Sequence, residues 1–166
     1  MKWLLIAVGI ALLGALFFWQ SHSTKTAYLN GLPLYRDLPN RQFIFEQDCY
    51  IFKLKAHDTD WPLVATHVAV PELPDEVSEK NIGADLPGVR ILGVARVGER
   101  FKIVSVRQQT TGKNVKISFE ILFLDEEAHK YARLDADDIM DHAPEAQGLP
   151  PTIRPEFAAS VAHPSQ

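Results

Sequence analysis

An uncharged apolar segment at the start of the chain sets the strongest constraint on how the rest can fold. No charged or strongly polar side chain occurs between Trp3 and Trp19, and a single cation, Lys2, precedes the segment. As a helix its 17 residues extend roughly 25 Å, against a hydrocarbon core about 30 Å thick. A helix apolar on every side would find nothing in a small domain to cover it, so residues 1–20 are predicted to form a transmembrane signal anchor.

A cleaved signal peptide is the alternative interpretation of the same segment. Ser21 and Ser23 supply small residues at the positions that precede a cleavage site, so the signal would end at about residue 23. The bulky aromatic residues at positions 17–19 favour an anchor, because such side chains gather at the membrane–water interface. Lys2 places the N-terminus in the cytoplasm. We therefore expect a single-pass inner-membrane protein, held in the membrane by residues 3–19, with its C-terminal domain in the periplasm of a Gram-negative cell.

The part that follows the anchor has the length and composition of one globular domain. It holds 16 Lys and Arg residues against 21 Asp and Glu residues, and this net charge of −5 argues against nucleic-acid binding. Cys49 is the only cysteine, which excludes an intrachain disulfide and a zinc–thiolate cluster. Its place in an apolar run predicts a buried thiol, with an intermolecular disulfide or a reactive thiol as the alternatives.

Polar and proline-rich stretches divide the chain. Residues 21–27 are short and polar and are predicted to form a linker. Residues 143–166 contain five prolines, which disfavour helix and strand, so a disordered tail is expected there. Residues 28–142 then form a β-domain interrupted by a long loop, 71–88, which either has a function or is a tolerated insertion. Within this loop, residues 74–83 resemble a short helix.

Period-two alternation is the clearest structural signal in the domain. It runs through Val115–Leu124 and predicts a strand with one buried face. The turn residues at 110–114 join it to Phe101–Gln109 as a hairpin, and the apolar pattern slips between Ile103 and Val104, which predicts a bulge.

Other apolar runs predict the remaining strands of a small, partly open barrel. The run at 91–97 is expected to precede the hairpin strands in a three-stranded meander. Asp135 is expected to cap one helical turn that reaches Met140. Four further runs are predicted as strands: 32–35, 43–54, 61–70 and 129–134.

Three short segments resemble the SH3-like barrels of bacterial envelope proteins. They are Gly31–Pro39, similar to an opening strand, Val97–Val104, similar to a turn and the following strand, and Leu134–Ile139, similar to a closing turn. The resemblance implies a binding or scaffolding module for a peptide or for cell-wall material, without catalytic residues. The candidate ligand-binding residues are two aromatic and three basic side chains: Tyr35, Trp61, Arg96, Arg100 and Lys102.

Charge is segregated along the second half of the domain. Residues 90–116 hold seven Lys and Arg residues against Glu99 alone, whereas acids dominate residues 117–145. Neighbouring antiparallel strands would let these charges pair; otherwise the basic strands form a patch for an anionic partner.

Two polar clusters allow a weaker metal hypothesis. One consists of His57, Asp58, Asp60 and His67, which an ordinary polar turn also explains. The other consists of Asp135, Asp137, Asp138, Asp141 and His142, where helix-terminal acids explain the pattern without calcium. Because no catalytic motif is present, we predict a protein with no cofactor and no metal site.

The sequence therefore predicts a non-enzymatic, membrane-anchored binding or adaptor module for a protein or cell-envelope component. The alternatives are a structural subunit that packs through its helix, and a small metal-dependent hydrolase that uses the His57 cluster.

Overall fold

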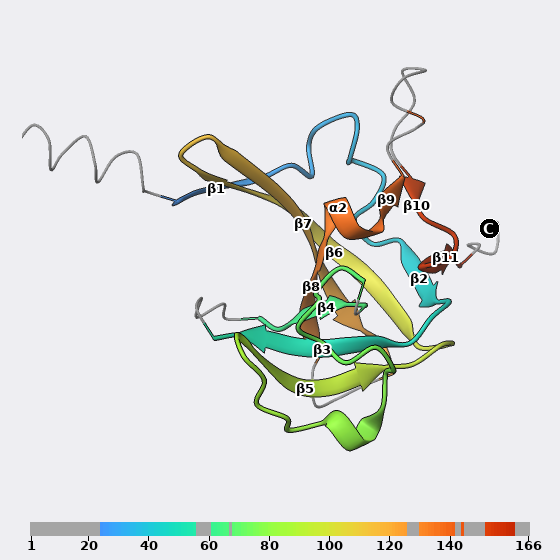
Figure 1. The fold of residues 1–166 in the computed structure, drawn as a ribbon. Coiled ribbons are helices and arrows are strands. Elements are labelled where there is room, and N and C mark those ends of the chain that lie inside the picture. Colours follow the sequence, from blue (N-terminus) through green and yellow to red (C-terminus); the bar gives the residue numbers. More distant parts are fainter. Residues whose placement is uncertain are drawn as a thin grey trace, which may run out of the picture.

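The computed structural model describes residues 24–55, 61–66, 68–125, 130–141, 144 and 152–161, which form a mainly β structure (Figure 1). One large sheet, which is not closed, follows the order β11-β2-β6-β7-β8-β4-β3-β5, and β1 also pairs with β6. Its strands are β1 (Thr24–Tyr28), β2 (Gln42–Phe45), β3 (Cys49–Leu54), β4 (Leu63–Ala65), β5 (Val89–Ala95), β6 (Arg100–Thr111), β7 (Asn114–Phe123), β8 (Tyr131–Asp135) and β11 (Ala158–Ser160). The other elements are the 3-10 turn η1 (Glu79–Asn81), the helical turn α2 (Ala136–Ile139) and the two-stranded pair β9 (Met140–Asp141) and β10 (Thr152–Ile153).

The predicted anchor, residues 1–20, lies outside the described residues. Within the part of the chain that is described, no helix has the length and apolar character needed to cross a bilayer.

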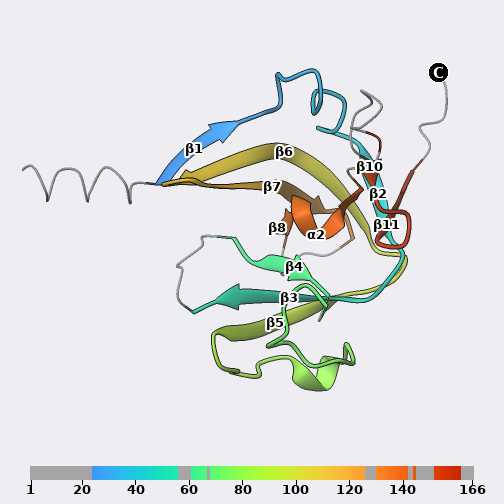
Figure 2. The same cartoon turned by 45° about the horizontal axis from the view of Figure 1, so that its top comes forward.

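The large sheet is strongly curved (Figure 2). The main hydrophobic core combines residues of β2 to β8, α2 and β11 with the turns between β1 and β2. A group of phenylalanines occupies its centre, where the Phe45 ring lies 4.5 Å from Phe101, 5.9 Å from Phe123 and 5.7 Å from Phe157 between centroids. These rings come from β2, β6, β7 and the segment before β11. Their contacts therefore pack an early strand of the described chain against its last segment. Burying several large aromatic side chains together is a main source of stability in a domain of this size.

The hairpin predicted from the alternating pattern is confirmed. Strands β6 and β7 pair from Phe101↔Phe123 to Thr111↔Asn114, and only Gly112 and Lys113 connect them. Gly112 has φ +60°, which suits the left-handed positions of a two-residue hairpin turn. The predicted bulge is also confirmed, since the register shifts between Ile103 and Ser105.

The predicted meander is wrong in its first strand. The chain does turn at Gly98 from β5 into β6, but β5 pairs with β3 at the far edge of the sheet. Strand β6 has no edge free for it, because β7 occupies one edge and β1 and β2 share the other. The connection bonds to β2 instead, with Gly98 N donating to Phe45 O at 2.9 Å.

The predicted strand at 32–35 is also wrong, because residues 30–40 form a series of turns. Backbone bonds from Leu32 N to Leu29 O and from Tyr35 N to Leu32 O close two of these turns. The turns bring Leu29, Tyr35 and Leu38 into the main core, whereas a strand would place Tyr35 and Leu38, three residues apart, on opposite faces.

Both ends of the domain extend further than predicted. Residues 24–27 of the expected linker belong to β1, which pairs with Arg107–Thr111. The expected disordered tail is wrong for 152–161: β10 pairs with β9, and β11 extends the sheet beside β2. Phe157 is 3% exposed in the main core. Prolines excluded long regular elements here but did not prevent short strands flanked by a buried ring.

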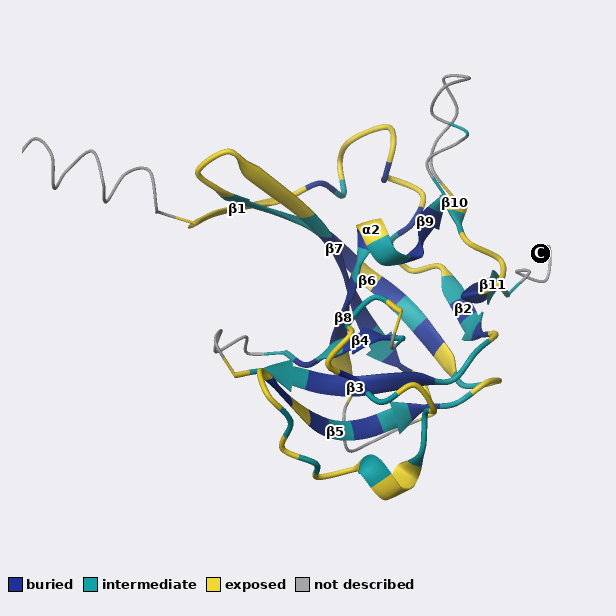
Figure 3. Cartoon of the chain, viewed as in Figure 1, coloured by how far each residue is buried: buried dark blue, intermediate teal, exposed yellow. Residues whose placement is uncertain are grey.

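The long loop covers a second apolar cluster on the outer face of β3, β4 and β5. Tyr50, Phe52 and Ile91 point into this cluster, opposite to the main core, and Leu73 of the loop is 3% exposed against them. As Figure 3 shows, β3 is buried along most of its length. The loop also protects the edge of β5, since Gly83 N donates to Ile91 O and Ile91 N donates to Ala84 O. The helix expected at 74–83 is reduced to η1.

Two local predictions hold. The carboxylate of Asp135 caps α2 by accepting a hydrogen bond from Asp137 N at 3.3 Å. Cys49 is fully buried, and this burial raises the pKa of its thiol to about 12, which keeps it protonated and unreactive at neutral pH.

Candidate functional site

A row of side chains crosses the outer face of β6, β7 and β8. Lys102, Leu122 and Tyr131 occupy matching register positions on the three strands. Their sequence neighbours Phe101, Phe123 and Ala132 are buried in the main core, so alternation points the row away from it. Trp61, just before β4, stacks on Tyr131 with ring centroids 5.1 Å apart and an interplanar angle of 29°. We call Trp61, Lys102, Leu122 and Tyr131 the aromatic face.

A buried charged row lies next to the aromatic face. Ser105, Glu120 and Arg133 are register partners across the same three strands. Ser105 Oγ donates a hydrogen bond to Glu120 Oε2. Glu120 Oε1 lies 3.7 Å from Arg107 Nη1 and 3.9 Å from Arg133 Nε, and the side chains of Glu120 and Arg133 are only 9% and 10% exposed. With so little solvent to screen them, these charges interact more strongly than a surface ion pair.

The charged row supports the aromatic face through one guanidinium group. Arg133 Cζ lies 5.7 Å from the centroid of the Trp61 ring, at the range of a cation–π contact. Glu120 holds Arg133, Arg133 contacts Trp61, and Trp61 stacks on Tyr131. Such a series of contacts restricts the rotamers of the exposed aromatic side chains before any partner binds, which lowers the entropy lost on binding.

Ion pairs and apolar side chains border the aromatic face. Arg100 donates to Asp125 twice, from Nε to Oδ2 at 3.0 Å and from Nη2 to Oδ1 at 2.6 Å. These bonds lower the pKa of Asp125, with the Arg100 side chain as the main cause. Leu124 and Val104 beside them are 36% and 37% exposed. Lys102 has no acidic partner among the residues that the structure describes, so its charge is available to a ligand.

The expected pairing of the basic and acidic halves is confirmed at three places. Besides Arg100–Asp125, Lys116 pairs with Asp135, and Arg107 lies near Glu120. Cross-strand neighbours therefore explain much of the charge segregation in the sequence.

The structure brings three of the five predicted ligand residues to one face. Trp61 and Lys102 belong to the aromatic face, and Arg100 borders it. Tyr35 is 6% exposed in the main core on the other side of the sheet, because the segment predicted as a strand forms turns there. Arg96 lies after β5 and is engaged by acids of two other segments.

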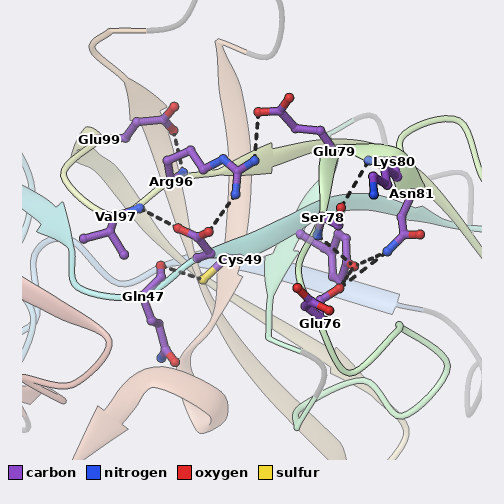
Figure 4. Close-up of polar contacts among 12 residues, drawn as sticks. Gln47, Cys49, Glu76, Ser78, Glu79, Lys80, Asn81, Arg96, Val97 and Glu99 are labelled. Carbon is purple, nitrogen blue, oxygen red and sulfur yellow. Dashed lines mark hydrogen bonds and ion pairs between the residues drawn. The ribbon is translucent and has the colours of Figure 1, made fainter.

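Arg96 helps to fix the long loop against the sheet (Figure 4). Its Nη1 lies 2.7 Å from Asp48 Oδ2 and its Nη2 lies 2.8 Å from Glu79 Oε1 in η1. Nearby, the Tyr50 hydroxyl donates to Glu76 O at 2.5 Å and accepts from Asn81 Nδ2 at 2.7 Å. Polar bonds at this edge and apolar contacts beneath thus hold the loop, which gives Arg96 a structural role.

The Asp48 contacts predict a loss of stability in acid. The backbone N–H of Val97 donates to Asp48 and, with Arg96, lowers the pKa of this carboxyl below its usual 3.8. Stability from a lowered pKa is complete above the ordinary value and is lost as the pH falls through the folded value. In urea titrations at about pH 6 and about pH 3, the wild type should therefore lose more unfolding free energy than Asp48→Asn. Equal losses in the two proteins would contradict this role.

The described residues include no group of three His, Cys, Asp or Glu side chains placed to hold a metal ion. The first predicted cluster, His57, Asp58, Asp60 and His67, lies outside the described residues. In the second, Asp135 caps α2 and pairs with Lys116. Burial, followed by the charge of Asp135, raises the pKa of Asp138.

Sequence reasoning did not single out Tyr131, Glu120, Arg133 or Leu122. The sequence did contain a usable pattern. Tyr131 and Arg133 alternate with buried apolar positions in the predicted strand 129–134, and Glu120 and Leu122 do so in the preceding predicted strand. Those positions had to face away from the core, but only the folded structure shows that Tyr131 and Arg133 contact Trp61.

Comparisons of the chain with protein-family models, with curated proteins and with solved structures found no match. The resemblance to SH3-like envelope modules therefore stays a prediction.

Proposed function

We propose that this protein is a non-enzymatic, membrane-anchored adaptor that binds a protein partner through the aromatic face. The observation that carries the proposal is the Trp61–Tyr131 stack, held by the buried Arg133 and Glu120 and left open to solvent on Tyr131, which is 43% exposed. The SH3-like resemblance, which implies a binding module, is consistent with this proposal.

The composition of the face favours a protein over other ligands. Binding hot spots are enriched in Trp, Tyr and Arg, surrounded by apolar contacts and a polar border. The aromatic face supplies the two aromatic rings, Leu122, Leu124 and Val104 supply apolar area, and the Arg100–Asp125 pair lies at the border. Lys102, which has no acidic partner among the described residues, favours an acidic group on the partner.

The membrane part of the proposal rests on the apolar sequence from Trp3 to Trp19. With Lys2 on the cytoplasmic side, the domain would meet its partner on the far side of the membrane, in the periplasm of a Gram-negative cell. A structural subunit that packs through its helix is the competing proposal, and it makes the aromatic face dispensable.

Changing the aromatic face should abolish partner capture. Because Tyr131 and Lys102 are solvent-accessible, Tyr131→Ser with Lys102→Glu should leave the fold intact while removing a hot-spot ring and reversing a charge. Losing a hot spot costs about 2 kcal/mol or more, so capture should fall by at least roughly thirtyfold. The measurement is quantitative mass spectrometry of crosslinked partners captured from detergent-solubilised membranes by the full-length variants.

The control variant is Val68→Ser, which changes a more exposed apolar side chain on the loop after β4, 77% exposed against 43% for Tyr131. It should capture the wild-type set of partners. If the aromatic-face variant also retains that set, the adaptor proposal is wrong. If a replacement of residues 1–20 by another anchor removes the partners while the aromatic-face variant keeps them, the structural-subunit alternative is correct.

A further inference from the structure

Strand β1 and the distal half of the β6–β7 hairpin project from the body of the domain as a three-stranded ribbon (Figures 1 and 2). We call residues 24–28 and 107–118 the β-arm. In the β-arm, β1 is exposed at all five positions and β7 is exposed from Asn114 to Lys116, whereas the central strand β6 is half-buried from Arg107 to Thr110 (Figure 3). A ribbon whose outer strands are exposed gains little stability from its own packing. Contact with a surface outside the domain would therefore stabilise it.

The β-arm carries positive charge only. It contains Lys25, Arg107, Lys113 and Lys116 and no acidic residue, in a chain whose net charge is −4. Arg107 and Lys116 are directed at Glu120 and Asp135 of the body. Lys25 and Lys113, both exposed near the tip, have no acidic partner within the described part of the chain. The apolar segment before the arm contains no acid either.

The tip of the β-arm lies where the chain leaves the predicted anchor. Thr24 pairs with Thr111, and their hydroxyl groups are 2.9 Å apart, so the β1 terminus lies beside the Gly112–Lys113 turn. Only residues 20–23 separate Trp19 from Thr24, and even a fully extended chain of that length spans no more than about 18 Å. Whatever the path of this segment, the turn stays close to the membrane surface if residues 3–19 are in the bilayer.

We propose that the tip of the β-arm rests on the membrane and that Lys25 and Lys113 contact the phosphate groups of anionic lipids. This inference rests on the anchor in the proposed function, and it adds a lipid partner and an orientation. Thr111 lies nine residue steps along β6 from Lys102, which at about 3.3 Å per residue places the aromatic face roughly 30 Å along the strand from the tip. The arm thus acts as a spacer that presents the aromatic face to a partner beyond the lipid surface.

Labels at the tip of the β-arm and near the opposite end of β6 test this orientation in the full-length protein. Asn114→Cys places a thiol at the tip, and Val97→Cys places one in the exposed turn before the opposite end of β6. The buried Cys49 does not compete for the label. Each variant, carrying an environment-sensitive fluorophore, is reconstituted in nanodiscs that contain phosphatidylglycerol and a lipid with a nitroxide on its headgroup. Quenching at position 114 should be strong and at position 97 close to background; equal quenching at both, or none at 114, overturns the proposal.

The charges are tested in the same nanodiscs. Each basic residue near an anionic surface contributes a factor of roughly five, so Lys25→Gln with Lys113→Gln should lower the ratio of docked to free arm by roughly 25-fold. Replacing phosphatidylglycerol by phosphatidylcholine should have the same effect on the unchanged arm. If quenching at position 114 is insensitive to both changes, the lysines do not bind lipid phosphate and the proposal is wrong.

Failure of the anchor can be recognised separately. Flotation with liposomes and the intact mass of the protein show whether residues 1–23 are retained and inserted. A protein that floats intact but shows no quenching at 114 contradicts only the β-arm inference. A protein that lacks its first 23 residues and does not float contradicts the anchor, and with it the β-arm inference, while partner capture through the aromatic face is measured independently.

Discussion

Replacing Glu120 by Leu is expected to lower the free energy of unfolding by about 3 kcal/mol, because it leaves two largely buried guanidinium groups without their shared carboxylate. The side chains of Glu120, Arg133 and Arg107 are 9%, 10% and 17% exposed, so water provides little compensation. Ser105 loses its acceptor at the same time. Urea denaturation monitored by tryptophan fluorescence provides the measurement, and Trp61 should report the loss of its Arg133 contact in the native baseline.

A double-mutant cycle separates the ion pair from a general packing defect. Arg133→Met in the wild-type background removes a charge that Glu120 stabilises, whereas in the Glu120→Leu background it removes a charge that lacks this partner. The first step should therefore lower the free energy of unfolding, whereas the second should recover part of the stability that Glu120→Leu has lost. Equal costs in both backgrounds would show that Glu120 and Arg133 do not interact, and the support proposed for Trp61 would fail with them.

Phe157→Ala is expected to destabilise the domain by about 3–5 kcal/mol, as for other phenylalanines removed from a well-packed core. The Phe157 ring is 3% exposed and meets Phe45 edge-on, with centroids 5.7 Å apart at 73°. Glu46 N also donates to Phe157 O, which ties this segment to the end of β2. Thermal or urea unfolding of the full-length variant in detergent measures the effect.

The adjacent Glu156 is the matched control for this prediction. It is exposed, so Glu156→Ala should change the unfolding free energy by less than about 0.5 kcal/mol. If Phe157→Ala behaves like Glu156→Ala, residues 152–161 do not belong to the core, and the disordered tail expected from the prolines would be the better description.

Features that depend on a few neighbouring residues were predictable from the sequence. The β6–β7 hairpin follows from alternation and from Gly112, the bulge from the phase slip at Ile103, and the cap of α2 from Asp135. In each case the determining interaction joins residues close in sequence, so the pattern contains the information needed. The fully buried Cys49 followed from its apolar surroundings in the same way.

Features that depend on which strands have a free hydrogen-bonding edge could not be predicted from the sequence. Whether β5 folds back on β6 depends on β1 and β2, which reach the same edge of β6 from earlier in the chain. Tyr35 shows the same limit within one segment, because the apolar run at 32–35 also fits a short strand until the turn hydrogen bonds are known. Proline density predicted a disordered tail, and nothing in the local sequence showed that Phe157 would complete the core.

The candidate site was half predictable for a related reason. Arg100, Lys102 and Trp61 were predictable as site residues, because basic and tryptophan side chains are typical of binding sites. Tyr131 becomes part of the site only through the parallel pairing of β4 with β8, which brings Leu63 beside Arg133 and Trp61 beside Tyr131. A pairing between segments so far apart in sequence leaves no local pattern.

The position of β11 at one end of the sheet has a consequence for biogenesis. Phe45 is synthesised early in translation, but the core around its ring is complete only after Phe157 has been synthesised. Long-range contacts of this kind slow folding and delay it until the distant segment is available. We expect the nascent domain to stay incompletely folded until residues 152–161 have left the ribosome. If the chain is exported across a membrane, as the proposed anchor implies, this delay would keep the domain from folding completely before it has crossed.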